Sequence, residues 1–416
     1  MATIRPFKAF RPEVSLAARC AALPYDVYNS TEARKEVDKE PLSFLAIDRP
    51  ETQFEVGHDM YADDVYQKAH DLLWQRIDDG TYVQDSVPCF YVYEQTMNGR
   101  TQTGLVGCAS VDDYINNVIK KHENTLERKE QDRIRHVDSC NAQTGPIFLG
   151  YRNNKEIDKT VEKIKYMQRP VYEFTSGDGT LNRVWVCADE DDVEKISDTF
   201  ETIDSIYIAD GHHRCASAVK VALKRRGEDP SPTGDKEYDF FLSVLFPENE
   251  LMIMDYNRVV KDLNGLTDQE FMDKITEKYD VEEAGSDAVK PSGKYHVSMY
   301  MNDKWYKLVA KESVRIDDAV EGLDVSILQN EILGPVLGIK DPKNDSRIDF
   351  VGGIRGLKEL ERRCHEDMKV AFAMYPTAIS ELFAVADAGR LMPPKSTWFE
   401  PKLLSGLFIH AFEDDH

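Results

Sequence analysis

The chain has 416 residues, of which 41% are hydrophobic and 31% charged, the composition of an ordinary globular protein with material for about two or three domains. Its 75 acidic and 52 basic residues give a net charge of −23, so we expect the surface to repel nucleic acid and anionic membranes. The seven dispersed cysteines include no C-x-x-C pair, and no apolar run reaches signal-peptide or membrane-spanning length, so we expect reduced thiols and a cytoplasmic protein.

The first 120 residues mix strand and helix patterns. The segment "SFLAIDR" (43–49) is strand-like, whereas residues 64–80 place apolar side chains at helical spacing ahead of a glycine. The Asn-Gly pair of "MNGR" (97–100) separates two apolar runs and predicts a β-hairpin. These patterns favour a mixed sheet with helices.

A highly charged helix is predicted after "KHENT" (121–125). Asn124 is followed three residues later by Glu127, a spacing that resembles a capping box with Asn in place of Ser or Thr. We therefore expect Asn124 to cap this helix.

The strongest local pattern is a strand-to-helix junction. The segment "SIYIAD" (205–210) predicts a strand, Gly211 interrupts it, and residues 212–226 predict a helix. The pattern of strand and helix signals changes near residue 262, and a later hairpin is predicted around Asn302 and Asp303. We expect a phosphate-binding region over 1–262 and an α+β region over 263–416 that packs on the first.

The junction has residues suited to an anion. A helix N-terminus presents unpaired N–H groups and a partial positive charge, and Gly211 allows close approach of the backbone. Arg214 offers a planar fork for phosphate oxygens, and His212 and His213 can donate hydrogen bonds or transfer protons. Asp210 could cap the helix or hold a metal. The alternative is an ordinary helix cap followed by surface residues.

A second cluster precedes and enters the charged helix. Glu123 is placed to act as a general base beside His122, while Lys121, Arg133 and His136 could bind an anion. The alternative is a solvated helix with ion pairs along its surface.

Five motifs together resemble the microbial domain-of-unknown-function family numbered 1015. They are "RPFKAFRP" with "LPYDV", "KHENT" with "GPIFLGY", "IADGHHRCASA", "SRIDFVGG" and "MPPKSTWFEPKLLSGL". More distantly, the turn at 211–214 is similar to the Gly-x-His-Arg phosphate-binding turn of the ParB/sulfiredoxin superfamily, which includes free-serine kinases. The resemblance implies an α+β fold with a ParB/sulfiredoxin-like mixed sheet, followed by a C-terminal α+β region.

The resemblance also implies an activity. A kinase of this kind would transfer phosphate to free L-serine from pyrophosphate, ATP or ADP, and Mg²⁺ is expected from the reaction class. Gly211, His212, His213 and Arg214 would clamp the phosphate. Asp210 is a catalytic candidate with Glu123 and His122, and its place at the junction makes it the candidate Mg²⁺ ligand. Glu123 is the candidate base, with Asp26 of "LPYDV" as its competitor.

Other readings stay open. The reactive cysteine of sulfiredoxins precedes the His-Arg pair, whereas Cys215 follows Arg214, so peroxiredoxin repair is disfavoured. A ParB-like nucleotide-binding switch would use the same turn, as would a phosphatase or hydrolase with water as acceptor. The donor, the acceptor and the oligomeric state are not determined by the sequence.

Overall fold

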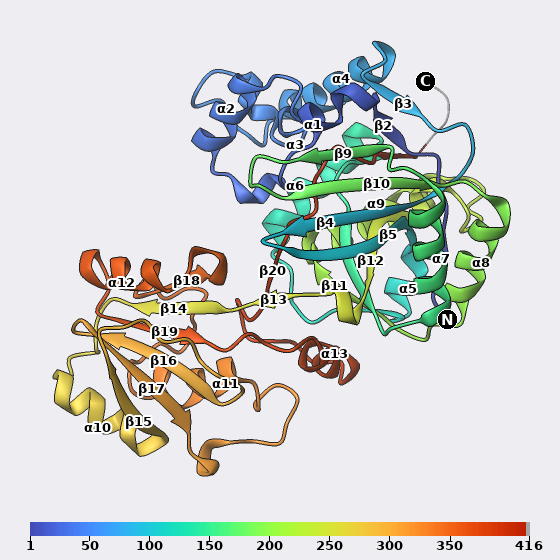
Figure 1. Ribbon diagram of the computed structural model, residues 1–416. Helices are drawn as coiled ribbons and strands as arrows, with labels where there is room; N and C mark the ends of the chain where they lie inside the picture. The colour runs from blue at the N-terminus through green and yellow to red at the C-terminus, as the bar shows by residue number, and fades with distance from the viewer. Residues whose placement is uncertain (413–416) are drawn as a thin grey trace. The chain divides into compact units, whose positions relative to one another are not determined.

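The computed structural model describes residues 1–412, which form two compact units (Figure 1). The first unit comprises residues 1–251 together with the segment that begins at Pro401, and the second comprises residues 252–400.

The first unit is built on a mixed sheet, which within residues 1–412 has nine strands in the order β6-β11-β8-β12-β5-β4-β10-β9, with β1 paired to β5. The pairs β11–β6 and β12–β8 are parallel and the others are antiparallel. The predicted α+β class with a mixed sheet is confirmed. The strands are β1 (Ile4–Arg5), β4 (Phe90–Met97), β5 (Arg100–Ser110), β6 (Ile119–Lys120), β8 (Ile147–Tyr151), β9 (Tyr172–Thr175), β10 (Leu181–Cys187), β11 (Ile206–Asp210) and β12 (Phe240–Pro247).

The predicted hairpin joins β4 to β5. Asn98 and Gly99 have φ values of 52° and 80°, and both residue types tolerate this left-handed region. Gly104 and Gly107 of β5 leave room for the rings of Phe246 and Phe90, since a Cβ at either glycine would lie within 3 Å of those rings. Strand β5 therefore packs closely against the rings of Phe246 and Phe90.

Helices surround this sheet. The chief ones are α4 (Asp63–Asp78), α6 (Glu127–Cys140), α7 (Lys155–Met167), α8 (Glu190–Glu201) and α9 (His212–Glu228). Helix α6 packs between α4 and α9, while α7 and α8 pack side by side (Figure 1). Shorter helices lie near the N-terminus and after β5: α1 (Ala17–Cys20), α2 (Ser30–Lys39), α3 (Leu45–Asp48) and α5 (Val111–Ile115). The core contains aliphatic side chains from β5, β8 and β11 and from α7, α8 and α9.

Two local predictions are wrong. The strand-like segment 43–49 contains the short helix α3, whose four residues are all buried, and a short apolar run does not distinguish a buried strand from a buried helix. Helix α6 begins at Glu127 after Leu126, and no side chain caps it, so Asn124 and Glu127 form no capping box. Instead, the Thr125 hydroxyl donates to Glu130 inside the first turn.

The second unit is a separate α+β structure. Its antiparallel sheet has the strand order β15-β17-β16-β19-β14-β18, and α12 (Leu357–Glu366) packs on β14, β16 and β19. The expected hairpin joins β16 to β17 through Asn302 and Asp303, which have φ values of 52° and 61°. The strands are β14 (Tyr256–Val260), β15 (Tyr279–Gly285), β16 (His296–Met301), β17 (Lys304–Ala310), β18 (Ile348–Gly352) and β19 (Val370–Met374), and the remaining helices are α10 (Asp268–Lys278), α11 (Asp324–Leu328) and α13 (Ile379–Asp387).

After the second unit, the chain returns to the first. Ser405 pairs with Ala22, and β21 (His410–Ala411) pairs with β7 (Ala142–Gln143) next to α6. The backbone of the C-terminal segment is thus hydrogen-bonded to elements that lie more than 250 residues earlier in the chain.

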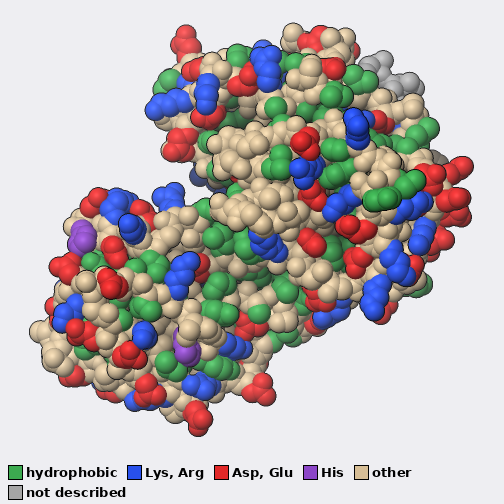
Figure 2. Space-filling model, in the orientation of Figure 1, with side chains coloured by type: hydrophobic (Ala, Val, Ile, Leu, Met, Phe, Trp, Pro, Cys, Tyr) green, Lys and Arg blue, Asp and Glu red, His purple; other side chains and the backbone are tan. Residues whose placement is uncertain are grey.

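All seven cysteines are free thiols. No helix within residues 1–412 combines the length and apolar character needed to cross a membrane. On the face drawn in Figure 2, acidic and basic side chains are intermingled.

Candidate phosphate site at the start of helix α9

The strand-to-helix junction forms as predicted. Strand β11 ends at Asp210, Gly211 adopts a left-handed conformation with φ of 90°, and α9 begins at His212. A residue with a Cβ would be strained at this φ, which explains the glycine. Because Gly211 has no side chain to accept from the first turn, no side chain of the N-cap residue satisfies the helix N–H groups. Such a helix start favours an anion.

Arg214 lies against this helix start. An atom at the Cβ position of Gly211 would be 3.1 Å from both Nε and Nη2 of Arg214, and one at Gly145 would be 3.6 Å from Nη1. The guanidinium therefore folds back beside the N-cap, and it also donates to the carbonyl oxygen of Pro146. Helix N–H groups and a guanidinium fork are brought to one place.

His212 contacts the loop 121–126. Its Nε2 accepts a long hydrogen bond of 3.5 Å from the His122 backbone N–H, and its Nδ1 lies 4.0 Å from Glu123 Oε2. Burial lowers the pKa of His212 to about 4, so the ring is neutral near pH 7. Since Nε2 accepts, the proton of the neutral ring is on Nδ1, the atom that faces Glu123.

His122 is fully buried beside His212. The two rings meet edge to face with centroids 4.4 Å apart. Neither ring nitrogen of His122 makes a hydrogen bond of good geometry within the described part of the chain. Burial, reinforced by His212, holds the pKa of His122 well below its usual range. Asp210 and the backbone of Ile208 oppose this shift, so the His122 ring has polar neighbours although neither nitrogen is well aligned with one.

His213 attaches the other end of the same loop. Its Nε2 accepts from the Leu126 backbone N–H at 2.9 Å. Burial and then Lys129 lower the pKa of His213, while Glu130 and Asp26 oppose the shift. Asp26 of the "LPYDV" segment thus lies within electrostatic range of His213. Both histidines therefore use Nε2 to hold the loop.

Asp210 is paired with a residue that the sequence analysis did not select. Its Oδ1 accepts from the Gly211 N–H at 3.0 Å, and its Oδ2 lies 3.2 Å from Lys402 Nζ. Burial raises the pKa of Asp210, but Lys402 and Arg214 outweigh it and hold this pKa at about 2. Lys402 belongs to the motif "MPPKSTWFEPKLLSGL", and no local spacing on the chain relates it to Asp210.

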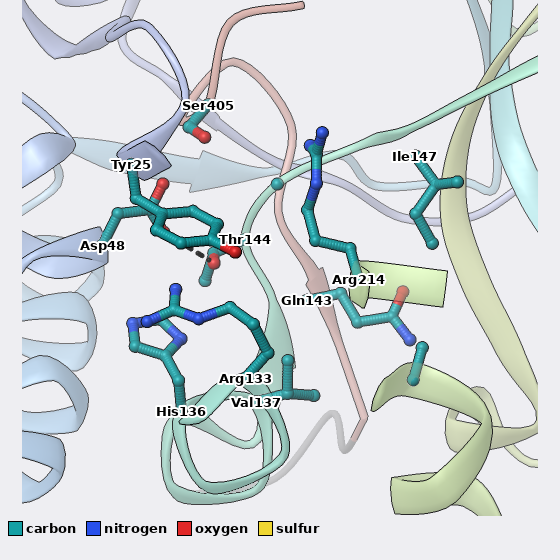
Figure 3. Close-up of a pocket in the computed structure, with 12 residues that line it drawn as sticks. Tyr25, Asp48, Arg133, His136, Val137, Gln143, Thr144, Ile147, Arg214 and Ser405 are labelled. Atoms are coloured by element: carbon teal, nitrogen blue, oxygen red, sulfur yellow. Dashed lines mark hydrogen bonds between the residues drawn. The ribbon is translucent and has the colours of Figure 1, made fainter. Parts of the chain in front are cut away.

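Arg133 and His136 line a small cavity of about 30 Å³, which Arg214 also lines (Figure 3). The Arg133 guanidinium pairs with Asp132 at 2.8 Å and lies 4.0 Å from the Tyr25 ring centroid. His136 Nε2 bonds the Ile47 carbonyl oxygen at 2.9 Å. The cavity is also lined by Asp48, Val137, Gln143, Thr144, Gly145, Ile147, Arg214, Ala218 and Ser405.

The candidate residues thus divide into two sets. His122, Glu123, Asp210 and the turn 211–214 meet at the start of α9, and Lys121 and Asp26 act electrostatically on His212 and His213 there. Arg133 and His136 lie in the cavity, and Arg214 lines the cavity as well. Helix α6, which contains Arg133 and His136, is not simply a solvent-exposed helix, because Glu130, Arg133, His136 and Cys140 are buried.

The described side chains at this site do not by themselves form a metal-binding group. Within residues 1–412, no group of three or more His, Cys, Asp or Glu side chains is arranged to hold a metal ion. Mg²⁺ in phosphate sites commonly takes one or two carboxylates and completes its shell with phosphate oxygens and water. Asp210 fits the part of such a single carboxylate ligand.

Comparisons with known proteins give one family and several distant structures. No curated protein sequence matches the chain. A free serine kinase in complex with AMP has a TM-score of 0.34 and 14% identity, covering 70% of this chain and 85% of that one. SbnI with a C-terminal truncation, from Staphylococcus aureus, has a TM-score of 0.40 and 11% identity, covering 75% and 90%. A conserved hypothetical protein from Pyrococcus furiosus has a TM-score of 0.32 and 15% identity, covering 72% and 93%.

The family model described as "Protein of unknown function (DUF1015)" matches residues 4–326, well over half of the chain. This match includes the loop 121–126 and the junction at Gly211, whereas Lys402 lies beyond the matched residues. The chain belongs to this family.

Proposed function

We propose that the protein is a phosphotransferase that phosphorylates the hydroxyl group of a small molecule, free L-serine above all, with pyrophosphate or a nucleotide as donor. The observation that carries the proposal is the Arg214 guanidinium at the uncapped start of α9, beside Gly211. Phosphoryl transfer depends chiefly on positioning and on neutralising the charge of the transferred group, and these groups supply both.

The phosphate groups of the donor would bind at the helix start. The N–H groups of the first turn and the planar fork of Arg214 are suited to phosphate oxygens. The His212 and His213 rings hold the loop 121–126 through Nε2, which leaves their backbone N–H groups as the phosphate contacts. Bound Mg²⁺, held by Asp210, would neutralise further phosphate charge.

Glu123 is the proposed base. The serine hydroxyl oxygen attacks the terminal phosphorus, the bond from that phosphorus to the bridging oxygen of the donor breaks, and the hydroxyl proton passes to the Glu123 carboxylate. The neutral His212 directs its Nδ1–H toward Oε2 of Glu123, which lies 4.0 Å away. His212 is thereby a positioning residue for the base.

Asp26 is the rival base. It is exposed on the short 3-10 helix at Tyr25–Val27, and its charge acts on His213 rather than on His212. The two carboxylates therefore approach the helix start from different segments. Substituting each in turn separates their contributions.

The test is phosphoserine formation from L-serine with pyrophosphate, ATP and ADP, each with Mg²⁺. We expect product with at least one donor, and a loss of about 10²–10⁴-fold in kcat for Glu123→Gln with little change for Asp26→Asn. The reverse pattern assigns the base to Asp26. Phosphate release without serine would indicate a hydrolase, and nucleotide binding without any turnover would indicate a ParB-like switch. Either result would overturn the kinase proposal.

A further inference from the structure

The C-terminal return of the chain places one cation at the start of α9. The backbone carbonyl of Lys402 accepts from Gln95 Nε2 at 3.0 Å, and the next two residues, Leu403 and Leu404, are buried in the first unit. The Lys402 side chain is 18% exposed. Its ammonium group is therefore directed to one position by a well-packed backbone.

The donors at this position converge on one carboxylate. The Gly211 N–H donates to Oδ1 of Asp210, and Lys402 Nζ contacts Oδ2. Arg214 also acts on Asp210, because together with Lys402 it lowers the pKa of this carboxyl against the effect of burial. The Asp210 carboxylate is thus the anion that the local donors contact in the protein as described.

The Lys402–Asp210 pair differs from an ion pair that only stabilises packing. Lys163 Nζ, for example, contacts both oxygens of Asp192 at 2.7 and 2.8 Å, which joins α7 to α8. Lys402 Nζ contacts Oδ2 of Asp210 at 3.2 Å, and this contact lies beside an uncapped helix start rather than between two helices. An ammonium group has three donors and can contact a carboxylate and a phosphate oxygen together.

We propose that Lys402 is a phosphate-binding residue, which contacts the donor phosphate at the start of α9 and loosens its pairing with Asp210 when phosphate binds. The inference rests on the proposed function, because it assumes phosphate at the helix start. It assigns the ligand class as pyrophosphate or the terminal phosphates of a nucleotide. It also makes Asp210 an internal anion that competes with phosphate for Lys402 when no divalent cation is present.

The experiment is calorimetric titration of the full chain with pyrophosphate in EDTA. We expect Lys402→Met to weaken binding about 10- to 100-fold, the usual effect of removing a hydrogen bond to a charged group. Lys402→Arg should retain most of the affinity, since it keeps the charge. Asp210→Asn should bind at least as tightly as the wild type, because the competing charge is gone. Lys163→Met is the matched control and should bind normally.

Three results would contradict the proposal, and each contradicts a different part of it. Wild-type affinity in Lys402→Met would overturn the role of Lys402 while leaving the phosphate site intact. Weakened binding in Asp210→Asn would overturn the competition between Asp210 and phosphate. Absence of pyrophosphate binding in the wild type would overturn the phosphate site and this inference together. Urea unfolding of each variant shows that it is folded, and Lys402→Arg gives a second readout should Lys402→Met unfold.

Discussion

The helix start and the neighbouring cavity use the same residue types in opposite ways. In the cavity, Arg133 pairs with Asp132, His136 bonds a carbonyl oxygen, and the Thr144 hydroxyl donates to Asp48. At the helix start, the first turn has no side-chain cap and Arg214 contacts a carbonyl oxygen. Arg133 has a carboxylate of its own, whereas at the helix start Arg214 and Lys402 both act on the single carboxylate of Asp210, beside uncapped N–H groups. We therefore propose that phosphate binds at the helix start and that Arg133 and His136 have a structural role.

Arg133→Met should produce the largest effect, and on stability rather than on binding. It leaves the half-buried Asp132 without its counter-ion, although the Tyr66 hydroxyl still donates to this carboxylate. Breaking a fully buried pair from one side costs about 3–5 kcal/mol, which is the upper bound here. We expect a fall of up to that size in the free energy of unfolding in urea, with the pyrophosphate Kd of the folded protein unchanged. A tenfold rise in Kd without loss of stability would show instead that the cavity belongs to the phosphate site.

Arg214→Ala should reduce activity and pyrophosphate binding rather than stability. Removing one preorganised donor to a developing charge costs about 10²–10³-fold in rate. We expect kcat/KM for phosphoserine formation to fall by this factor and pyrophosphate binding to weaken. Arg225→Ala is the control, because Arg225 lies on the same helix and pairs with Asp138 away from the helix start. Equal losses of activity in the two variants would contradict a specific role for Arg214.

The buried imidazoles predict a pH dependence of stability. His212 has a pKa of about 4 when folded and 6.5 otherwise, so between these values the unfolded chain binds more protons and stability falls as the pH falls. From pH 7 to pH 4.5 the loss due to His212 is about 2–3 kcal/mol, and His122 contributes with the same sign. The contribution of Asp210 disappears only between its ordinary value and about 2, outside this window.

The variant His212→Gln tests whether the buried, neutral His212 causes this pH dependence of stability. The variant should show a shallower decline of the unfolding free energy between pH 7 and pH 4.5, by most of the amount given to His212. An unchanged slope would mean that His212 is protonated in the folded protein. In that case the ring could not accept the His122 N–H.

Local patterns on the chain predicted the junction well but not its surroundings. The strand, the glycine and the helix at 205–226 follow from periodicity and from the backbone freedom of Gly211, so they could be found without a structure. The placement of Arg133 and Arg214 on one cavity could not be found in this way, because it depends on how α6 packs against α4 and α9. Lys402 was missed for the same reason, since only the return of the chain brings it to Asp210.

The failed capping box has a related cause. The spacing of Asn124 and Glu127 satisfies the local rule, but Glu130 takes the Thr125 hydroxyl and His213 takes the Leu126 N–H. Contacts with α9 thus replaced the local cap. Helix ends that pack against another element are where sequence spacing is least informative.

His213→Ala should have the smallest effect, and it tests whether the histidines of the turn clamp the loop or bind phosphate. In the structure, His213 Nε2 accepts the Leu126 N–H at 2.9 Å. Losing that acceptor should cost about 1 kcal/mol of stability and speed hydrogen exchange at Leu126. The pyrophosphate Kd should change by less than about threefold, well under the effect of a lost charge-assisted bond. A tenfold weaker Kd with unaltered exchange at Leu126 would instead place the His213 ring on the phosphate. The division between a ligand-binding backbone and loop-holding side chains at the start of α9 would then be wrong.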